Sequence, residues 1–447
     1  EFTKLEYNKE YCTRLITNKK ISKKKDKLIE TSFWYADFEA DVSGKIHKPY
    51  MCCIQRDNGD GDEFKTFKGF DCAIEFLDFI PDESVVYFHN LAYDFRMFQQ
   101  HCKIISMLKK GNEIFNALVR YKGKTLRFRD TLPMLNCKLS AIPGMFRLYS
   151  KIRKEIFPYK YYTLDRLRSN IGVISECGKD EDKPWNEEDM KTFINNIDFI
   201  DGCRLSNDTF DMYKYAEFYC HQDVAILREG FEQFCEDFWF EFDVKPKDFV
   251  SISALANEVF RQRVYIPNGN LYEYSGVVQK FIQKAVHGGR CMCAFNKKWK
   301  LNVRIKDTDA VSLYPSAMSR LYTVEGVPEV LKEHDPNIIH KSIPSFLSNK
   351  TAYVVDIGIV KVNKRYAFPS VKQKVNGLNL HDDNMARCAA GEALKEDIIM
   401  RVDDIYLEDL VKFQQIEFKV IGGYYWTGKK DYTIREVIKE LFDKRAE

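Results

Sequence analysis

The sequence predicts a chain of mixed α/β (α+β) class that folds into more than one domain. Apolar stretches with the character of strands, at 33–40, 84–88, 351–360 and 418–426, are interspersed with segments that fit helices, such as 216–227. The chain has 447 residues, which exceeds the size at which a single core stops growing, so two or three domains are expected. Phe and Tyr, at 33 and 25 copies, favour cores rich in sheet and also supply rings that could stack on bases.

The composition is that of a soluble protein of a reducing compartment. The net charge of +3 gives no overall electrostatic signature, so any surface for nucleic acid must be local. A lysine-rich cluster at 19–27 could meet phosphates or form a solvated tail. Thirteen cysteines, an odd number without paired Cys-x-x-Cys spacing, favour free thiols over disulfides or a zinc site. Since no signal peptide or membrane-spanning apolar run is found, we expect an intracellular protein without a membrane partner.

The segment 33–40 reads as a strand that carries two carboxylates. Asp37 and Glu39 lie two residues apart, so their side chains point to the same face of the strand. Two neighbouring carboxylates repel each other, and a buried pair needs a cation, for which a divalent metal is the natural choice. A charged solvent face would give the same spacing, and both interpretations remain open at this point.

Two later segments carry further carboxylates. After the strand at 84–88, His89 and Asn90 lead into a helix that places Asp94 in its first turn, where the helix dipole favours negative charge. Farther on, Tyr219 and Asp223 lie four residues apart and are neighbours on one helix face. A phenol beside a carboxylate can hold a water molecule that a metal on the carboxylate also holds. A helix cap at Asp94 and a half-buried tyrosine with a rim aspartate are the plainer alternatives.

The segment 307–318 combines an apolar strand that carries Asp307 and Asp309 with an abrupt turn at Tyr314-Pro315. A strand that delivers an aspartate and then breaks presents a ligand for a hard metal beside backbone amides that can hold phosphate. Asp309 is the expected ligand.

The sequence from Asp309 to Ser316 resembles motif A of family B DNA polymerases, the Asp-x-x-Ser-Leu-Tyr-Pro-Ser segment of the palm domain. This resemblance implies that Asp309 is a catalytic metal ligand. It also implies that Ser312, Leu313 and Tyr314 position the incoming nucleoside triphosphate.

Three groups of residues that precede this segment resemble the exonuclease motifs of the DnaQ-like, RNase H-like 3′→5′ proofreading domain. They are Asp37-x-Glu39, Asn90-x-x-x-Asp94 and Tyr219-x-x-x-Asp223, and their order matches that of family B polymerases. The resemblance implies two Mg²⁺ ions per active site, with Mn²⁺ as a possible substitute, about 3.5–4 Å apart. The four carboxylates would be the metal ligands, and Tyr219 would orient the attacking water.

Shorter matches imply residues that contact DNA. Asn90 and Leu139 correspond to positions that contact single-stranded DNA, and Lys154 to a lysine that supports the exonuclease site. Gly288 and Gly289 resemble the Tyr-x-Gly-Gly/Ala motif between the exonuclease and the palm, where glycines let the backbone approach a DNA strand. Two positions depart from these patterns: Lys138 replaces a Ser or Thr, and Val286 replaces the Tyr.

The resemblance implies a protein-primed polymerase of a virus, linear plasmid or self-synthesising transposon, in the host nucleus or cytoplasm if viral. Its partners would be primer–template and single-stranded DNA, dNTPs and a terminal (priming) protein. The expected domains are a basic segment at 1–30, the exonuclease at 31–243, a helical connection at 244–300, and a partial palm at 301–447 with an insertion at about 320–415.

Residues 310–447 contain neither the fingers motif (motif B) nor the second palm motif (motif C) of the family. The chain also lacks an initiator Met and a helix stop signal at its end, so we expect a piece of a longer protein that excises nucleotides but does not extend primers. Two alternatives remain. The chain could be a stand-alone exonuclease with a vestigial palm, or a DNA-binding replication subunit without catalytic activity.

Overall fold

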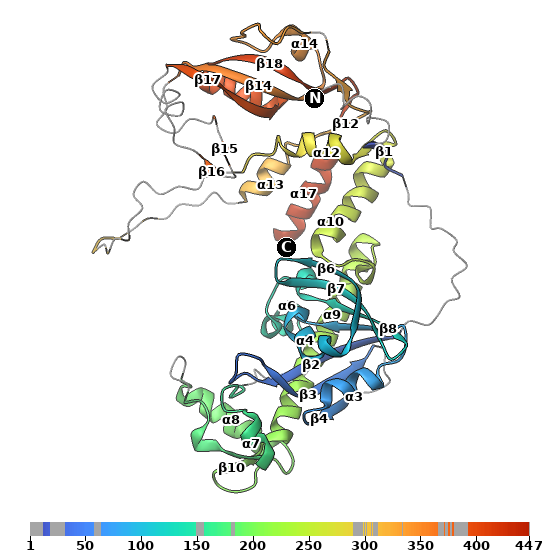
Figure 1. The fold of residues 1–447 in the computed structure, drawn as a ribbon, viewed down its shortest axis with the longest axis vertical. Coiled ribbons are helices and arrows are strands. Elements are labelled where there is room, and N and C mark those ends of the chain that lie inside the picture. The colour runs from blue at the N-terminus through green and yellow to red at the C-terminus, as the bar shows by residue number, and fades with distance from the viewer. Residues whose placement is uncertain are drawn as a thin grey trace. The chain divides into compact units, whose positions relative to one another are not determined.

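The computed structural model divides into two compact units, Ser22–Val259 and the combination of Glu1–Ile21 with Phe260–Glu447 (Figure 1). The structure describes residues 12–17, 32–57, 64–148, 156–179, 184–288, 298, 300, 302–304, 306, 312–332, 334–364, 371, 374–375, 378–379 and 392–446. The division at Val259 falls within the segment 244–300 that the sequence assigns to a connection.

A seven-stranded mixed sheet forms the centre of the unit Ser22–Val259, with the strand order β4-β3-β2-β5-β8-β7-β6. Its strands are β2 (Phe33–Asp41), β3 (Lys48–Arg56), β4 (Phe64–Lys68), β5 (Val85–Phe88), β6 (Lys103–Lys110), β7 (Glu113–Tyr121) and β8 (Lys124–Asp130). β5 runs parallel to both β2 and β8, and the other neighbours are antiparallel. The carboxyl ends of β2, β5 and β8 therefore lie at one edge of the sheet.

Helices cover both faces of this sheet. The helices α3 (Cys72–Phe79) and α4 (Leu91–Phe98) pack on one face, and α9 (Met212–Phe242) packs on the other. The other α-helices that follow the strands are α5 (Leu132–Leu135), α6 (Ile142–Met145), α7 (Leu164–Ser169) and α8 (Glu187–Phe199). A short antiparallel pair, β9 (Ile171–Val173) with β10 (Thr209–Asp211), precedes α9. In Figure 1 the long helix α9 crosses the sheet, on which it packs mainly against β2 and β3.

Alternate residues of β2 pack into two separate cores. Tyr35 belongs to the core that includes α9, whereas Ala36 and Phe38 belong to the core of α3 and α4 on the opposite face. Side chains alternate along a strand, so Asp37 and Glu39 share the face of Tyr35 and lie on the side of α9.

A glycine lets α6 approach α9 closely. A Cβ added at Gly230 of α9 would lie 2.0 Å from Cγ2 of Ile142, so no larger residue fits without a shift. The segment that begins with the 3₁₀ turn η2 (Leu139–Ala141) and continues into α6 is thereby packed against α9.

The second unit contains a four-stranded antiparallel sheet in the order β13-β18-β14-β17. The strands of this sheet are β13 (Glu329–Val330), β14 (Ala352–Val362), β17 (Ala393–Asp403) and β18 (Ile416–Trp426). Three two-stranded sheets accompany it: β1 (Thr13–Leu15) pairs with β11 (Tyr272–Tyr274), β12 (Thr323–Val324) pairs with β19 (Lys430–Asp431), and β15 (Lys374–Val375) pairs with β16 (Leu378–Asn379). Helix α10 (Ile252–Phe260) belongs to the unit Ser22–Val259 except for its last residue. The helices of the second unit are the π-helical turn η5 (Arg261–Tyr265), α11 (Ile266–Asn268), α12 (Gly276–Gln283), α13 (Leu313–Met318), α14 (Ser345–Ser348), α16 (Asp404–Asp409), the π-helical turn η6 (Leu410–Gln414) and α17 (Thr433–Ala446).

A partly buried ion pair ties α12 to the sheet of this unit. Arg401 of β17 donates to both carboxylate oxygens of Asp356 on β14, at 2.8 and 2.6 Å. Its guanidinium also lies 3.5 Å from the ring centroid of Phe281 on α12. One arginine therefore joins two strands and a helix.

The secondary structure expected from the sequence is confirmed for the main elements of this unit. The strands expected at 351–360 and 418–426 are β14 and β18, and the terminal helix is α17. The stretch 244–281 is mostly helical, as expected, but it also contains β11. This strand was missed because its partner β1 lies at the other end of the chain.

Among the described residues, no helix is both long and apolar enough to cross a membrane. The ten cysteines that the structure describes are free thiols.

Candidate active site

Four carboxylates from three elements meet at the carboxyl edge of β2 and β5. Asp37 and Glu39 come from β2, Asp94 from α4 and Asp223 from α9. The negative charges of Asp94, Glu39 and Asp223 all act on Asp37 and raise its pKa. The structure thus brings together four of the five carboxylates that the sequence predicts as metal ligands; the fifth, Asp309, lies outside the described residues.

Burial is the main cause of the raised pKa values in this cluster. Glu39 is 5% exposed and Asp94 is 2% exposed, and burial raises the pKa of each well above its usual range. Burial also raises the pKa of Asp223 to about 7, although a hydrogen bond from Tyr219 opposes the shift. Carboxylates gathered in this way are unfavourable as anions unless a cation compensates them.

A backbone hydrogen bond fixes Asp94 against β2. The amide of Phe38, which lies between the two β2 carboxylates, donates to Oδ1 of Asp94 at 3.2 Å. No side chain caps α4, so the plainer role of Asp94 as a capping residue finds no support. Asp94 instead joins helix α4 to the strand that carries Asp37 and Glu39.

Two tyrosines stand beside Asp223. The hydroxyl of Tyr219, one turn before Asp223 on α9, lies 2.7 Å from the hydroxyl of Tyr159. Burial and then the charge of Asp223 raise the pKa of Tyr219, so its phenol stays protonated and can donate. Tyr159 was not predicted, because it lies in the irregular segment 156–163, where no periodicity relates it to Tyr219.

The donor set fits a hard divalent cation. Carboxylate oxygens of Asp37 and Glu39, together with Sγ of Cys220, lie within 4.8 Å of one another. The carboxylate of Glu39 makes no hydrogen bond or ion pair within the described part of the chain, so its charge has no partner there. Clustered carboxylate oxygens are the ligands that Mg²⁺ and Mn²⁺ prefer.

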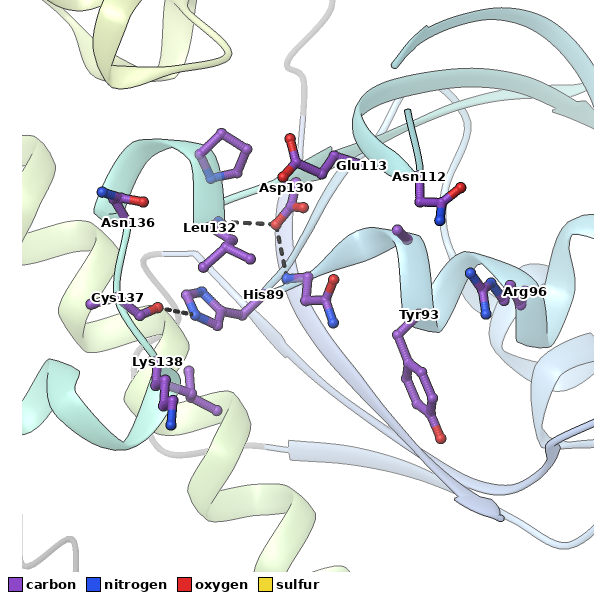
Figure 2. A pocket seen from close by; sticks show the side chains of 14 residues that line it. His89, Tyr93, Arg96, Asn112, Glu113, Asp130, Leu132, Asn136, Cys137 and Lys138 are labelled. Atoms are coloured by element: carbon purple, nitrogen blue, oxygen red, sulfur yellow. Dashed lines mark hydrogen bonds between the residues drawn. The ribbon is translucent and has the colours of Figure 1, made fainter. Parts of the chain in front are cut away.

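A pocket of about 840 Å³ opens where β5 and β8 end (Figure 2). Among its lining residues are Asn90 and Leu139, both predicted to contact DNA, and also Tyr93, Arg96 and Lys138. Burial and then the charges of Glu39, Asp94 and Asp37 raise the pKa of Tyr93, so this wall of the pocket adjoins the carboxylate cluster. The spacing of Tyr93 one turn after Asn90 was the signal in the sequence that could have indicated its place here.

The wall of the pocket is held by Asp130 and His89, as Figure 2 shows. Oδ1 of Asp130 accepts from the backbone amides of Asn90 and Leu132, both at 2.9 Å. Nδ1 of His89 lies 2.9 Å from Oγ1 of Thr131, and Nε2 lies 2.9 Å from the carbonyl of Cys137. These contacts hold Asn90 in a left-handed conformation with a φ of 74°, which few residues other than glycine adopt.

The other predicted site residues belong to the second unit or fall outside the described residues. Ser312 precedes α13 with a φ of 53°, while Leu313 and Tyr314 are 60% and 81% exposed. Gly288 is exposed beyond α12. The remaining predictions fall outside the residues that the structure describes; they are Lys154, Gly289 and Asp309.

The fold and the cluster together define a mixed α/β protein with an acidic site at the carboxyl edge of a sheet. A family model described as DNA polymerase type B, organellar and viral, matches residues 77–447. The chain therefore belongs to this family of polymerases, as the resemblance of its motifs implied.

Two curated relatives are described as probable DNA polymerases. The protein from Neurospora intermedia is 25% identical over 269 residues, which cover 57% of this chain and 26% of the relative. The protein from Ascobolus immersus is 25% identical over 256 residues, which cover 54% of this chain and 20% of the relative. The aligned parts thus span 26% and 20% of the length of these relatives.

Solved structures of Phi29 DNA polymerase share the fold. The complex with primer–template DNA and incoming nucleotide substrates has a TM-score of 0.56 and 14% identity, with 92% of this chain and 63% of that chain covered. The complex with single-stranded DNA has a TM-score of 0.55 and 14% identity, with 93% and 64% covered. The expected fold class, an α/β chain with the architecture of a family B polymerase, is confirmed.

Proposed function

We propose that the unit Ser22–Val259 is a 3′→5′ exonuclease that proofreads for a family B DNA polymerase. The observation that carries this proposal is the meeting of Asp37, Glu39, Asp94 and Asp223 at one sheet edge, with an unpartnered buried carboxylate at its centre. In the sheet, β4, β3 and β2 are antiparallel neighbours, and β5 and β8 follow them in the direction of β2. This arrangement supports an RNase H-like domain.

The four carboxylates would hold two Mg²⁺ ions, or two Mn²⁺ ions. When bound, such ions lower the pKa of the attacking water and stabilise the leaving 3′-oxygen. Tyr219 would orient this water, because its protonated hydroxyl lies beside Asp223. Tyr159 would hold the hydroxyl of Tyr219 in place, since the two oxygens are 2.7 Å apart.

The pocket beside the cluster would receive the last nucleotides of the strand. Asn90 and Leu139 line it, and the exposed cation of Lys138 at its rim could meet a phosphate. The aromatic ring of Tyr93 offers a surface on which a base can stack. Lys154, Gly288 and Gly289 are proposed as further DNA contacts from the motifs alone.

For the whole polymerase, we propose DNA-directed DNA synthesis by the same two-metal chemistry, with primer–template DNA and dNTPs as substrates. Asp309 would bind metal, and Ser312, Leu313 and Tyr314 would position the nucleotide. Family membership and the fold shared with Phi29 polymerase support this assignment. Priming by a terminal protein is proposed on the resemblance of the motifs.

Digestion of a single-stranded oligonucleotide labelled at its 5′ end, in the presence of Mg²⁺, tests the exonuclease. We expect a ladder of shortened products from the chain and none from its Asp37→Asn/Glu39→Gln variant. Glu75→Gln, which changes an exposed carboxylate on α3, is the matched control and should digest normally. Binding of the oligonucleotide without digestion by the unaltered chain would overturn the proposal in favour of a non-catalytic subunit.

A parallel reaction with primer–template and dNTPs tests the expectation that this chain does not extend primers.

A further inference from the structure

Cys220 lies inside the carboxylate cluster but has no role in the proposed proofreading reaction. It follows Tyr219 on α9, and its side chain is fully buried. Its Sγ is 3.6 Å from the carbonyl oxygen of Asp37 and 3.9 Å from Oδ2 of the same residue. The thiol therefore reaches the strand that carries two of the four carboxylates.

The helical repeat explains why a thiol is at this position. Ala216, Cys220 and Val224 are spaced four residues apart, and all three are buried where α9 packs on the sheet. Cysteine behaves as a small apolar residue in such a stripe. Unlike Ala216 and Val224, however, Cys220 places a soft ligand atom, its Sγ, beside the carboxylates.

The distances suit a site with mixed ligands. Sγ of Cys220 and carboxylate oxygens of Asp37 and Glu39 all lie within 4.8 Å of one another. In a tetrahedral zinc site with the usual bond lengths, neighbouring ligand atoms are about 3.3–3.7 Å apart. Small side-chain rotations would therefore close the site.

An independent observation comes from Glu39. Its side chain is 95% buried, since only 5% is exposed, and it has no hydrogen-bond or ion-pair partner among the described residues. One of its carboxylate oxygens is among the three clustered ligand atoms. A buried carboxylate that has no other partner and lies beside a thiol is the arrangement expected of a cation site.

We propose that Cys220, Asp37 and Glu39 form a site for a thiophilic divalent ion such as Zn²⁺ or Cd²⁺, which displaces Mg²⁺ and inhibits digestion. The inhibition part rests on the proposed exonuclease function, because it requires that Asp37 and Glu39 hold the catalytic metal. On binding, the metal forms a bond to sulfur, the S–H bond breaks, and the proton passes to solvent. Soft thiolate ligands select zinc-like ions over Mg²⁺, which prefers oxygen.

A second thiol supports the position of the first. Cys53 on β3 is the cross-strand neighbour of Asp37, its charge acts on the thiol of Cys220, and its Sγ lies 3.7 Å from Oγ1 of Thr66. Cys53 would act as a residue that positions Cys220, in the way that outer partners orient the ligands of metal sites.

Titration of the 447-residue chain with Cd²⁺ tests the site, with the ultraviolet charge-transfer absorption of the cadmium–thiolate bond as the readout. We expect one equivalent of Cd²⁺ to give a band that disappears in Cys220→Ser and persists in Cys203→Ser. Cys203 is a matched control because it is equally buried but hydrogen-bonds to the carbonyl of Asp211. Glu39→Gln should keep the thiol but weaken Cd²⁺ binding about tenfold or more.

The same variants are then assayed for digestion in Mg²⁺ with added Cd²⁺, each relative to its own rate without Cd²⁺. The Cd²⁺ concentration that halves the rate should rise about tenfold or more in Cys220→Ser and stay the same in Cys203→Ser. A band that is unchanged in Cys220→Ser, or affinity that is unchanged in Glu39→Gln, overturns the mixed site. If a band that depends on Cys220 appears in a chain that does not digest DNA, the metal site stands and the exonuclease proposal fails.

Discussion

Replacing Asp130 by Asn tests whether the wall of the pocket is built as described. The carboxylate is 5% exposed, and Oδ1 accepts from the amides of Asn90 and Leu132. Burial raises the pKa of Asp130 from 3.8 to about 6, even though these hydrogen bonds oppose the shift. The folded chain therefore binds the proton more tightly than the unfolded chain does.

The sign and size of the effect follow from this shift. An acid with a raised pKa in the folded state contributes most stability below its unfolded pKa of 3.8, and this contribution is lost as the pH rises through about 6. The difference between the two values corresponds to about 3 kcal/mol. Asp130→Asn removes the charge but keeps an oxygen acceptor, so the free energy of unfolding at neutral pH should rise by up to about 3 kcal/mol.

Urea unfolding at a series of pH values measures this difference. We expect the gain of Asp130→Asn over the unaltered chain to be largest above pH about 6 and to vanish toward pH about 4. Asp78→Asn is the control with the opposite sign, because hydrogen bonds from Lys122 and Tyr121 lower the pKa of the exposed Asp78. A gain that does not change with pH, or an Asn variant that is less stable at neutral pH, would refute the reasoning.

Three further predictions concern other elements of the chain. Tyr219→Phe should slow digestion about tenfold to a hundredfold without weakening the binding of the oligonucleotide, which separate measurements of rate and affinity would show. Gly230→Ala should lower the free energy of unfolding by about 1–3 kcal/mol, because its Cβ would lie 2.0 Å from Cγ2 of Ile142, and a urea midpoint equal to that of the unaltered chain would contradict this. Arg401→Ala should cost about 2–4 kcal/mol, since it leaves the partly buried Asp356 without its ion pair, and the double variant with Asp356→Asn should recover part of this loss.

Short-range periodicity was enough to place some of the site residues. Asp37 and Glu39 share a face because the repeat of a strand is two residues, and the structure has them together on β2. Tyr219 and Asp223 are neighbours because they lie one turn apart in α9. Local rules of this kind need no knowledge of the rest of the fold.

Other site residues could not be found in this way. Cys220 hydrogen-bonds to Asp37 across 183 positions of the sequence, and Tyr159 meets Tyr219 across 60 positions. Asp130 supports Asn90 because β8 and β5 are parallel neighbours whose ends meet at one edge. Cys220, Tyr159 and Asp130 are not defining positions of any of the motifs recognised in the sequence.

The order of the acidic motifs, the elements that carry them and the family of the chain can be predicted from the sequence, because they depend on spacing within single strands and helices. The neighbours that surround the carboxylates follow from the tertiary fold alone. The pairing of β2, β5 and β8 and the packing of α9 across them bring a thiol, a second tyrosine and a supporting aspartate to the site. Those contacts arise from the burial of apolar faces far apart in the chain, which is a property of the whole fold and not of any one segment.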